Sequence, residues 1–195
     1  MRFYLLIFLG IALGLAACKG PKKDETQEQM TAPEEEQDIS AFDPALKKLL
    51  GTDTSGTFRG IDLGQSKEKV KVIEANKASS QGDSLISETD SIINYTISFT
   101  ATEEADLLYY FTADNKLKKI EADIYPPSEA VQTKLFKQLT TFYSAKYGNG
   151  IEIDNNEVLW NIKQPQSVII LKKTGNEKVH DLQLSFVSLP GDSAQ

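Results

Sequence analysis

The chain has 195 residues, 40% of them hydrophobic and 25% charged, and these values are ordinary for a globular protein. Its formal net charge of -7 argues against a nucleic-acid partner, because phosphate binding requires clustered Lys and Arg side chains. Arginine occurs only as Arg2 and Arg59, so a site for phosphate or carboxylate ligands would depend on Arg59 or on lysines.

The first 17 residues have the form of a secretory signal peptide. Arg2 supplies the positive charge at its start. The apolar stretch that follows, residues 3–17, is shorter than the stretch of about 20 residues that a membrane-spanning helix needs. The end of this stretch, Leu15-Ala16-Ala17-Cys18, resembles the lipobox of bacterial lipoproteins. The resemblance implies that a diacylglycerol with fatty acids such as palmitate is joined to the sulfur of Cys18. Residues 1–17 would then be removed, leaving Cys18 as the acylated N-terminus.

Lipid on Cys18 would determine where the protein resides. We expect a lipid-anchored protein of the cell envelope, held in the outer membrane of a Gram-negative bacterium by more than one acyl chain. Residues 22–25 resemble the export signals of Bacteroidota surface lipoproteins, but those signals usually lie closer to the Cys. The periplasmic face is therefore favoured over the cell surface. The alternative interpretation is an uncleaved anchor with an incidental Cys. Cys18 is the only Cys, so the mature chain can form no internal disulfide.

Residues 18–40 are predicted to be a disordered tether, because they contain two prolines and almost no large apolar side chain. Such a tether reaches roughly 25 Å. The acidic run over residues 34–38 is interpreted as solvated linker, and the alternative is a docking segment for a basic partner. Residues 41–190 are predicted to form a single domain, followed by a disordered tail over residues 191–195.

Two helices are predicted to begin the domain. Asp43 can cap a helix over residues 45–50 that ends at Gly51, and Ser66 can cap a second helix to about Lys77. Residues 79–91 are polar and are predicted to form a loop. Alternating apolar side chains then predict strands over residues 93–99, 107–111 and 118–125. The middle strand is apolar at every position, so we expect it to be buried on both faces.

The second half follows the same order. After Pro126-Pro127, Ser128 can cap a long helix that ends at Gly148, and strands are predicted over residues 158–162, 168–172 and 182–187. Short turns between the strands imply antiparallel pairing. The predicted fold class is α+β, an antiparallel sheet with helices on one face, built from two successive helix-plus-three-strand units.

Residues Gly64 to Val70 resemble the start of small envelope lipoproteins of the BamE/SmpA type and of domains with the β-lactamase-inhibitor-protein-like fold. In those proteins a Gly precedes a Ser or Thr cap, a Val follows four residues after the cap, and the helix leads into an antiparallel sheet. The resemblance covers residues 58–125 and, more loosely, residues 128–187. It implies a noncatalytic protein-binding role in the envelope.

Candidate catalytic and metal-binding groups are few. The only His, His180, adjoins Asp181, but adjacent residues of a strand point to opposite faces and make a poor acid–base pair. Residues 154–157 offer oxygen ligands for calcium without the Gly and Glu of an EF-hand loop, so a turn is favoured. Residues 148–150 follow a helix, which is typical of a helix end and not of a phosphate loop. We therefore expect no enzyme activity, no cofactor and no metal site.

Aromatic and apolar side chains outside the core are the best candidates for a binding surface. Most tyrosines should be core residues, whereas Leu108, Tyr110 and one of Leu159 and Trp160 could lie on an uncovered sheet face. We expect a module that binds another envelope protein, through a sheet face or through residues 79–91. The alternatives are a carrier of a small molecule or lipid, which predicts a sizeable apolar pocket, and an inhibitor of a secreted hydrolase. An enzyme would need carboxylates of shifted pKa in a cleft.

Replacement of the lipidated residue tests the membrane anchor. We expect Cys18→Ser to release the protein from membranes and to block processing, because only a thiol can form the thioether. Membrane fractionation and the mass of the chain measure the two effects. A processed variant that stays in the membrane fraction would contradict the lipid anchor.

Overall fold

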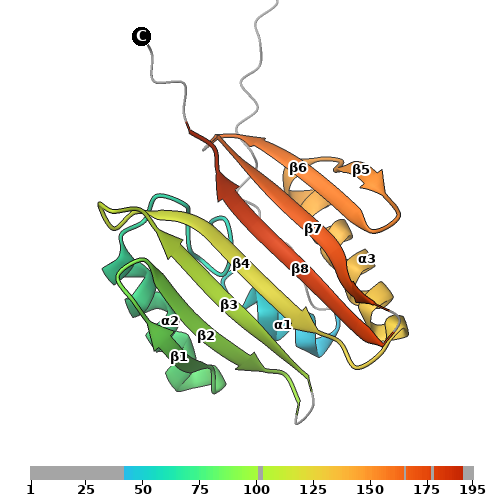
Figure 1. Ribbon diagram of the computed structural model, residues 1–195, viewed down its shortest axis with the longest axis horizontal. Helices are drawn as coiled ribbons and strands as arrows, with labels where there is room; N and C mark the ends of the chain where they lie inside the picture. Colours follow the sequence, from blue (N-terminus) through green and yellow to red (C-terminus); the bar gives the residue numbers. More distant parts are fainter. Residues whose placement is uncertain (1–41, 101–102, 165, 177, 191–195) are drawn as a thin grey trace, which may run out of the picture. The chain divides into compact units, whose positions relative to one another are not determined.

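The computed structural model describes residues 42–100, 103–164, 166–176 and 178–190 (Figure 1). The signal peptide, Cys18, the tether and the tail that the sequence predicts lie outside these residues. The described part of the chain is α+β, with one eight-stranded antiparallel sheet and three helices. The predicted fold class is confirmed at this level.

The three helices are α1 (Pro44–Leu50), α2 (Lys67–Gln81) and α3 (Glu129–Tyr147). Each begins at its predicted cap, whose side chain accepts a backbone hydrogen bond: Asp43 from Ala45 at 3.0 Å, Ser66 from Lys69 at 3.3 Å, and Ser128 from Val131 at 3.4 Å. α2 continues beyond the predicted end at Lys77, and Gly82 ends it in the left-handed conformation.

The strands are β1 (Ser84–Glu88), β2 (Ile92–Ser98), β3 (Glu104–Phe111), β4 (Leu117–Tyr125), β5 (Ile151–Asp154), β6 (Glu157–Lys163), β7 (Gln166–Asn176) and β8 (Val179–Ser188). The six predicted strands are confirmed, and β1 and β5 are additional. β1 lies where the sequence predicted a loop over residues 79–91, and that prediction is wrong. Both additional strands are exposed along their whole length. Because neither strand has a buried face, its sequence lacks the long alternation of apolar and polar residues that predicts a strand.

Strand order in the sheet is β1-β2-β3-β4-β8-β7-β6-β5. β1 and β5 are the two edges, and the halves of the chain meet where β4 pairs with β8 in antiparallel register. Each half contributes four strands to the sheet, where the sequence predicted three.

All three helices lie on one face of the sheet, behind the strands in Figure 1. The side chains on this face form the core and include Tyr109, Ile120, Trp160 and Phe186, all of them buried. On the opposite face Leu108 and Tyr110 are only half-buried. The expectation that β3 is buried on both faces is therefore wrong, because among the described residues no helix covers its second face.

A buried cluster of charged groups joins α1, α2 and β3. Arg59 is 1% exposed, and its Nε and Nη2 atoms each donate to a carboxylate oxygen of Glu74 at 3.3 Å. Nη2 also donates to Asp83 Oδ2 at 2.6 Å, while Nη1 donates to the carbonyls of Lys48 and Leu49 at 2.9 and 3.0 Å. These bonds use all the N–H donors of the guanidinium. Arg59 is therefore not available to a phosphate or carboxylate ligand.

Two further side chains complete the Arg59 cluster. The hydroxyl of Tyr109 on β3 donates to Glu74 Oε1 at 2.8 Å. The ammonium of Lys77 donates to the carbonyl oxygen of Arg59 itself. Arg59 has a φ of 56°, a left-handed conformation that is unfavourable for a side chain of this size. The cluster thus holds the backbone as well as the side chain of Arg59.

Replacement of Arg59 tests the contribution of the cluster to stability. We expect Arg59→Met to lower the free energy of unfolding by about 3–5 kcal/mol, because Asp83 would remain buried without a cation and Glu74 would keep only Lys77, at 3.4 Å. The control Lys134→Met removes the pair between Lys134, 57% exposed, and Asp43, and should lower it by less than about 1 kcal/mol. Urea unfolding measures both variants, and similar losses in the two would contradict the argument.

Candidate functional site

The candidate site is the sheet face opposite the helices, which we call the open face. Trp160 is buried against the helices beside Tyr143, with ring centroids 5.8 Å apart, so Leu159 is the residue of that pair on the open face. The apolar side chains of the open face are half-buried and come from β2, β3, β6, β7 and β8: Ile92, Leu108, Tyr110, Leu159, Val168, Ile170 and Val187.

A row of polar side chains crosses the open face on adjacent strands. Asp106 of β3 lies opposite Asp123 of β4, with Thr96 of β2 and Gln183 of β8 on either side. Thr96 Oγ1 donates to Asp106 Oδ1 at 2.6 Å, and Gln183 Nε2 donates to Asp123 Oδ1 at 2.9 Å. The hydroxyl of Tyr125 donates to the second oxygen of Asp106 at 3.2 Å. No ion pair within the described residues reaches either aspartate.

Glu121 lies next to this row on β4 and has a different environment. The hydroxyls of Tyr110 and Ser185 donate to its two oxygens at 3.2 and 3.4 Å, and the ammonium of Lys119 pairs with it. Lys119 also lies 5.0 Å from the centre of the Tyr110 ring. Glu121 therefore forms an ion pair, in contrast to Asp106 and Asp123.

Two carboxyl groups of the open face, those of Asp123 and Asp181, are in surroundings that disfavour their charged form. Burial raises the pKa of the Asp123 carboxyl, and Glu121 and Asp106 raise it further. The hydrogen bond from Gln183 and the charge of Lys119 lower this pKa in part. Burial likewise raises the pKa of Asp181 on β8, against the effect of the neighbouring His180. A cation placed over these carboxylates would relieve their repulsion.

The structure does not bring the sequence-predicted catalytic and metal candidates together. His180 lies near the start of β8 opposite Gly175. Asp154 accepts a hydrogen bond from the Asn156 backbone at 2.7 Å, which confirms a turn over residues 154–157. Gly148 ends α3 as predicted. Within the described residues, no group of three or more His, Cys, Asp or Glu side chains is placed to hold a metal ion.

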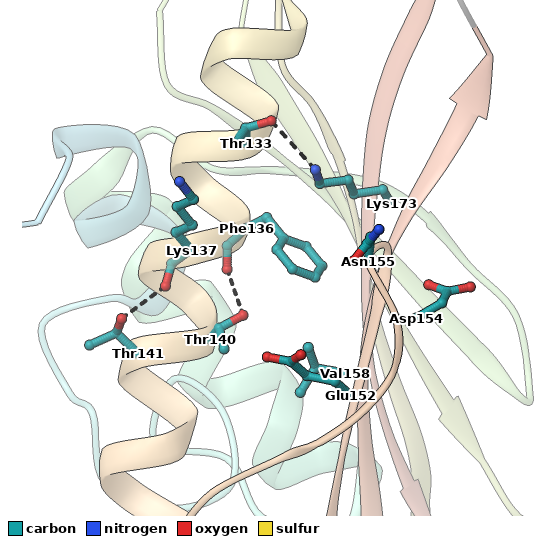
Figure 2. Close-up of a pocket in the computed structure, with 10 residues that line it drawn as sticks. All are labelled: Thr133, Phe136, Lys137, Thr140, Thr141, Glu152, Asp154, Asn155, Val158 and Lys173. Carbon is teal, nitrogen blue, oxygen red and sulfur yellow. Dashed lines mark hydrogen bonds between the residues drawn. The ribbon is translucent and has the colours of Figure 1, made fainter.

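A groove lies between α3 and the hairpin of β5 and β6 (Figure 2). Its volume is about 470 Å³, and its walls include Phe136 and Lys137 of α3, Glu152 of β5 and Val158 of β6. The ammonium of Lys173 donates to Thr133 Oγ1 at 3.4 Å on the α3 side. The groove does not include the carboxylates of the open face.

The space between α1, α3 and β4 is much smaller. It has a volume of about 10 Å³ and is lined by apolar side chains such as Leu46, Ile124 and Leu139. This is room for at most one water molecule, far below the few hundred Å³ of a typical ligand pocket.

Comparison with known proteins finds no matching family model, and neither a characterised protein nor a solved structure matches the chain. The resemblances of residues 15–18 to a lipobox and of residues 64–70 to envelope lipoproteins therefore stay predictions. None of the helices in the described residues is long and apolar enough to span a membrane.

Removal of the Asp123 charge tests the electrostatics of the open face. A raised pKa means that the folded state binds the proton more tightly than the unfolded chain, so ionised Asp123 destabilises the fold at pH 7. We expect Asp123→Asn to be more stable than the parent at pH 7, by less than about 1 kcal/mol because the group is half-exposed. The gain should vanish below the unfolded pKa of about 4.

Asp114→Asn is the matched control in the same urea unfolding series. The hydrogen bond from Thr112 lowers the pKa of Asp114, so this variant should show no gain at pH 7. Equal gains in the two variants would mean that net charge, and not the open face, sets the effect.

Proposed function

We propose that the protein is a lipid-anchored envelope protein that acts as a noncatalytic protein-binding module, and that its partner binds the open face. The observation that carries the proposal is an eight-stranded sheet face left uncovered by the helices, on which apolar side chains adjoin Asp106 and Asp123. Exposed apolar surface of this kind is typical of protein-binding surfaces.

The charges of the open face indicate the chemistry of the partner. Asp106 and Asp123 form no ion pair with any of the described residues, and Leu108 of β3 and Ile170 of β7 lie further along the same face. A partner surface with a Lys or Arg among apolar side chains would complement this arrangement. Arg is also among the residues most enriched at the energetic centres of protein interfaces.

Two alternatives receive less support from the geometry. A carrier of a lipid or small molecule requires a sizeable apolar pocket. The groove of about 470 Å³ beside α3 is lined mostly by polar side chains, and the apolar space between α1, α3 and β4 is about 10 Å³. An enzyme requires its titrating groups in a cleft, whereas Asp106 and Asp123 lie on a sheet face outside the groove. A noncatalytic role therefore fits best.

The anchor and tether complete the proposal. Lipid on Cys18 would hold the chain at the outer membrane of a Gram-negative envelope, with the periplasmic face favoured. A tether of roughly 25 Å would let the domain turn its open face toward a partner in the same membrane or in the periplasm.

In-cell crosslinking with a photoreactive residue at Leu108 tests the proposal. We expect one envelope protein to be captured, and Ile170→Glu to reduce its capture about tenfold or more, because a new carboxylate would adjoin the apolar surface of the interface. Val72→Glu is the matched control, since Val72 is 61% exposed on α2, on the helix side of the sheet.

The identity of the captured protein separates the remaining hypotheses. A secreted hydrolase whose activity falls on binding would identify the module as an inhibitor. Equal capture by the parent and by Ile170→Glu would place the interface elsewhere, and co-purified lipid without a protein would favour a carrier.

A further inference from the structure

The sheet edge at β5 is a second surface, separate from the carboxylates of the open face. β5 pairs with β6 on one side only within the described residues, so its other side presents N–H and C=O groups to a further strand. Ile151 and Ile153 on this strand are 54% and 58% exposed. An exposed apolar edge of this kind is a ready template for strand addition.

The register fixes which way the side chains of β5 point. Ile151 pairs with Leu159 and so belongs to the open face, whereas Glu152 pairs with Val158 on the helix side. Figure 2 shows the Glu152 carboxylate pointing into the groove, toward the Thr140 side of α3. A strand added to β5 would therefore place alternate side chains beside Ile151 and beside Glu152.

The start of β5 is held firmly against its neighbour. A Cβ atom at Gly150 would lie 2.5 Å from Val158 Cγ1 and 2.8 Å from atoms of Trp160, so glycine permits this close approach. The buried side chains of β6 therefore position the start of the edge at Ile151 and Glu152. The register of β5 shifts between Glu152 and Asp154, so these two residues offer the regular part of the edge to an incoming strand.

The charge of the hairpin indicates what kind of strand fits. Residues 151–160 contain Glu152, Asp154 and Glu157 and no Lys or Arg. Lys173 of β7 lines the same groove, but its ammonium donates to Thr133 Oγ1 at 3.4 Å and lies 5.2 Å from the centre of the Phe136 ring, both on α3. Lys137 stands on the α3 wall of the groove, and Figure 2 shows its ammonium directed along the helix, away from Glu152.

At the opposite edge of the sheet the acidic side chain of the strand is paired with lysines. On β1 the carboxylate of Glu88 pairs with Lys67 at 3.0 Å and with Lys71 at 2.8 Å, both on α2. No ion pair in the described part of the chain reaches Glu152 or Asp154. Only the β5 edge thus presents unneutralised negative charge beside exposed isoleucines.

We propose that β5 binds an extended segment of a partner protein in which apolar and basic residues alternate. The segment adds as a further strand, with its apolar side chains beside Ile151 and a Lys or Arg beside Glu152. A second copy of this chain fits less well, because antiparallel pairing of two β5 edges would bring like charges opposite one another.

Titration of the full chain with synthetic peptides tests the proposal. The probe is a capped peptide of alternating Lys and Val, and two controls separate the contributions. One has the same side chains but N-methyl groups on alternate residues, which block strand pairing, and the other has Glu in place of Lys. We expect the first peptide to bind measurably in calorimetry and both controls to bind at least tenfold more weakly.

Charge reversal on the protein gives the second measurement. We expect Glu152→Lys to weaken the Lys peptide about fivefold or more and to strengthen the Glu peptide, because cross-strand charge pairs determine the preference. The gain for the Glu peptide also shows that the variant is folded. The matched control Asp90→Lys reverses a charge in the exposed turn between β1 and β2 and should change neither affinity.

Three outcomes would overturn the proposal. Equal binding of the N-methylated peptide would mean attraction by charge without strand addition. Unchanged affinities in Glu152→Lys would place binding elsewhere, including on the open face. Self-association of the parent chain in sedimentation, lost when β5 is altered, would make a second copy the occupant.

Discussion

The buried guanidinium of Arg59 is the constraint on which the arrangement of the domain depends. A charge removed from water requires partners for all its donors, and those partners come from the end of α1, from α2 and from Asp83 just before β1. Arg59 belongs to the segment between α1 and α2, and α3 contacts the same segment. The ammonium of Lys146 on α3 donates to the carbonyls of Thr54 and Gly56. Residues 51–66 thus fasten both halves of the helical layer to one another.

All of these contacts lie on the helix side of the sheet, and none of them involves the open face. The core, the Arg59 cluster and the helices all lie behind the strands, so no structural task occupies the open face. Groups that oppose the stability of a fold are expected mainly at functional sites. The repulsion among Asp106, Glu121 and Asp123 is therefore easier to understand as a feature of binding than as a contribution to folding.

Local patterns predicted the helices and the six inner strands, because caps and alternating side chains depend on near neighbours in the chain. The same patterns could not identify Glu74 as buried, since an acidic helix position becomes buried only when a distant residue such as Arg59 supplies its partner. Alternation placed Asp123 on the polar side of β4, but its approach to Asp106 depends on strand register. The edge strands were missed because they are short and face no core.

Pairing of β4 with β8 has a consequence for the order of folding. More than fifty residues separate β4 from β8, so the two halves can join only after β8 has been synthesised. Until then β4 is an unpaired apolar edge, open to misassembly with other chains. Formation of this long-range pair should be slow relative to the hairpins on either side.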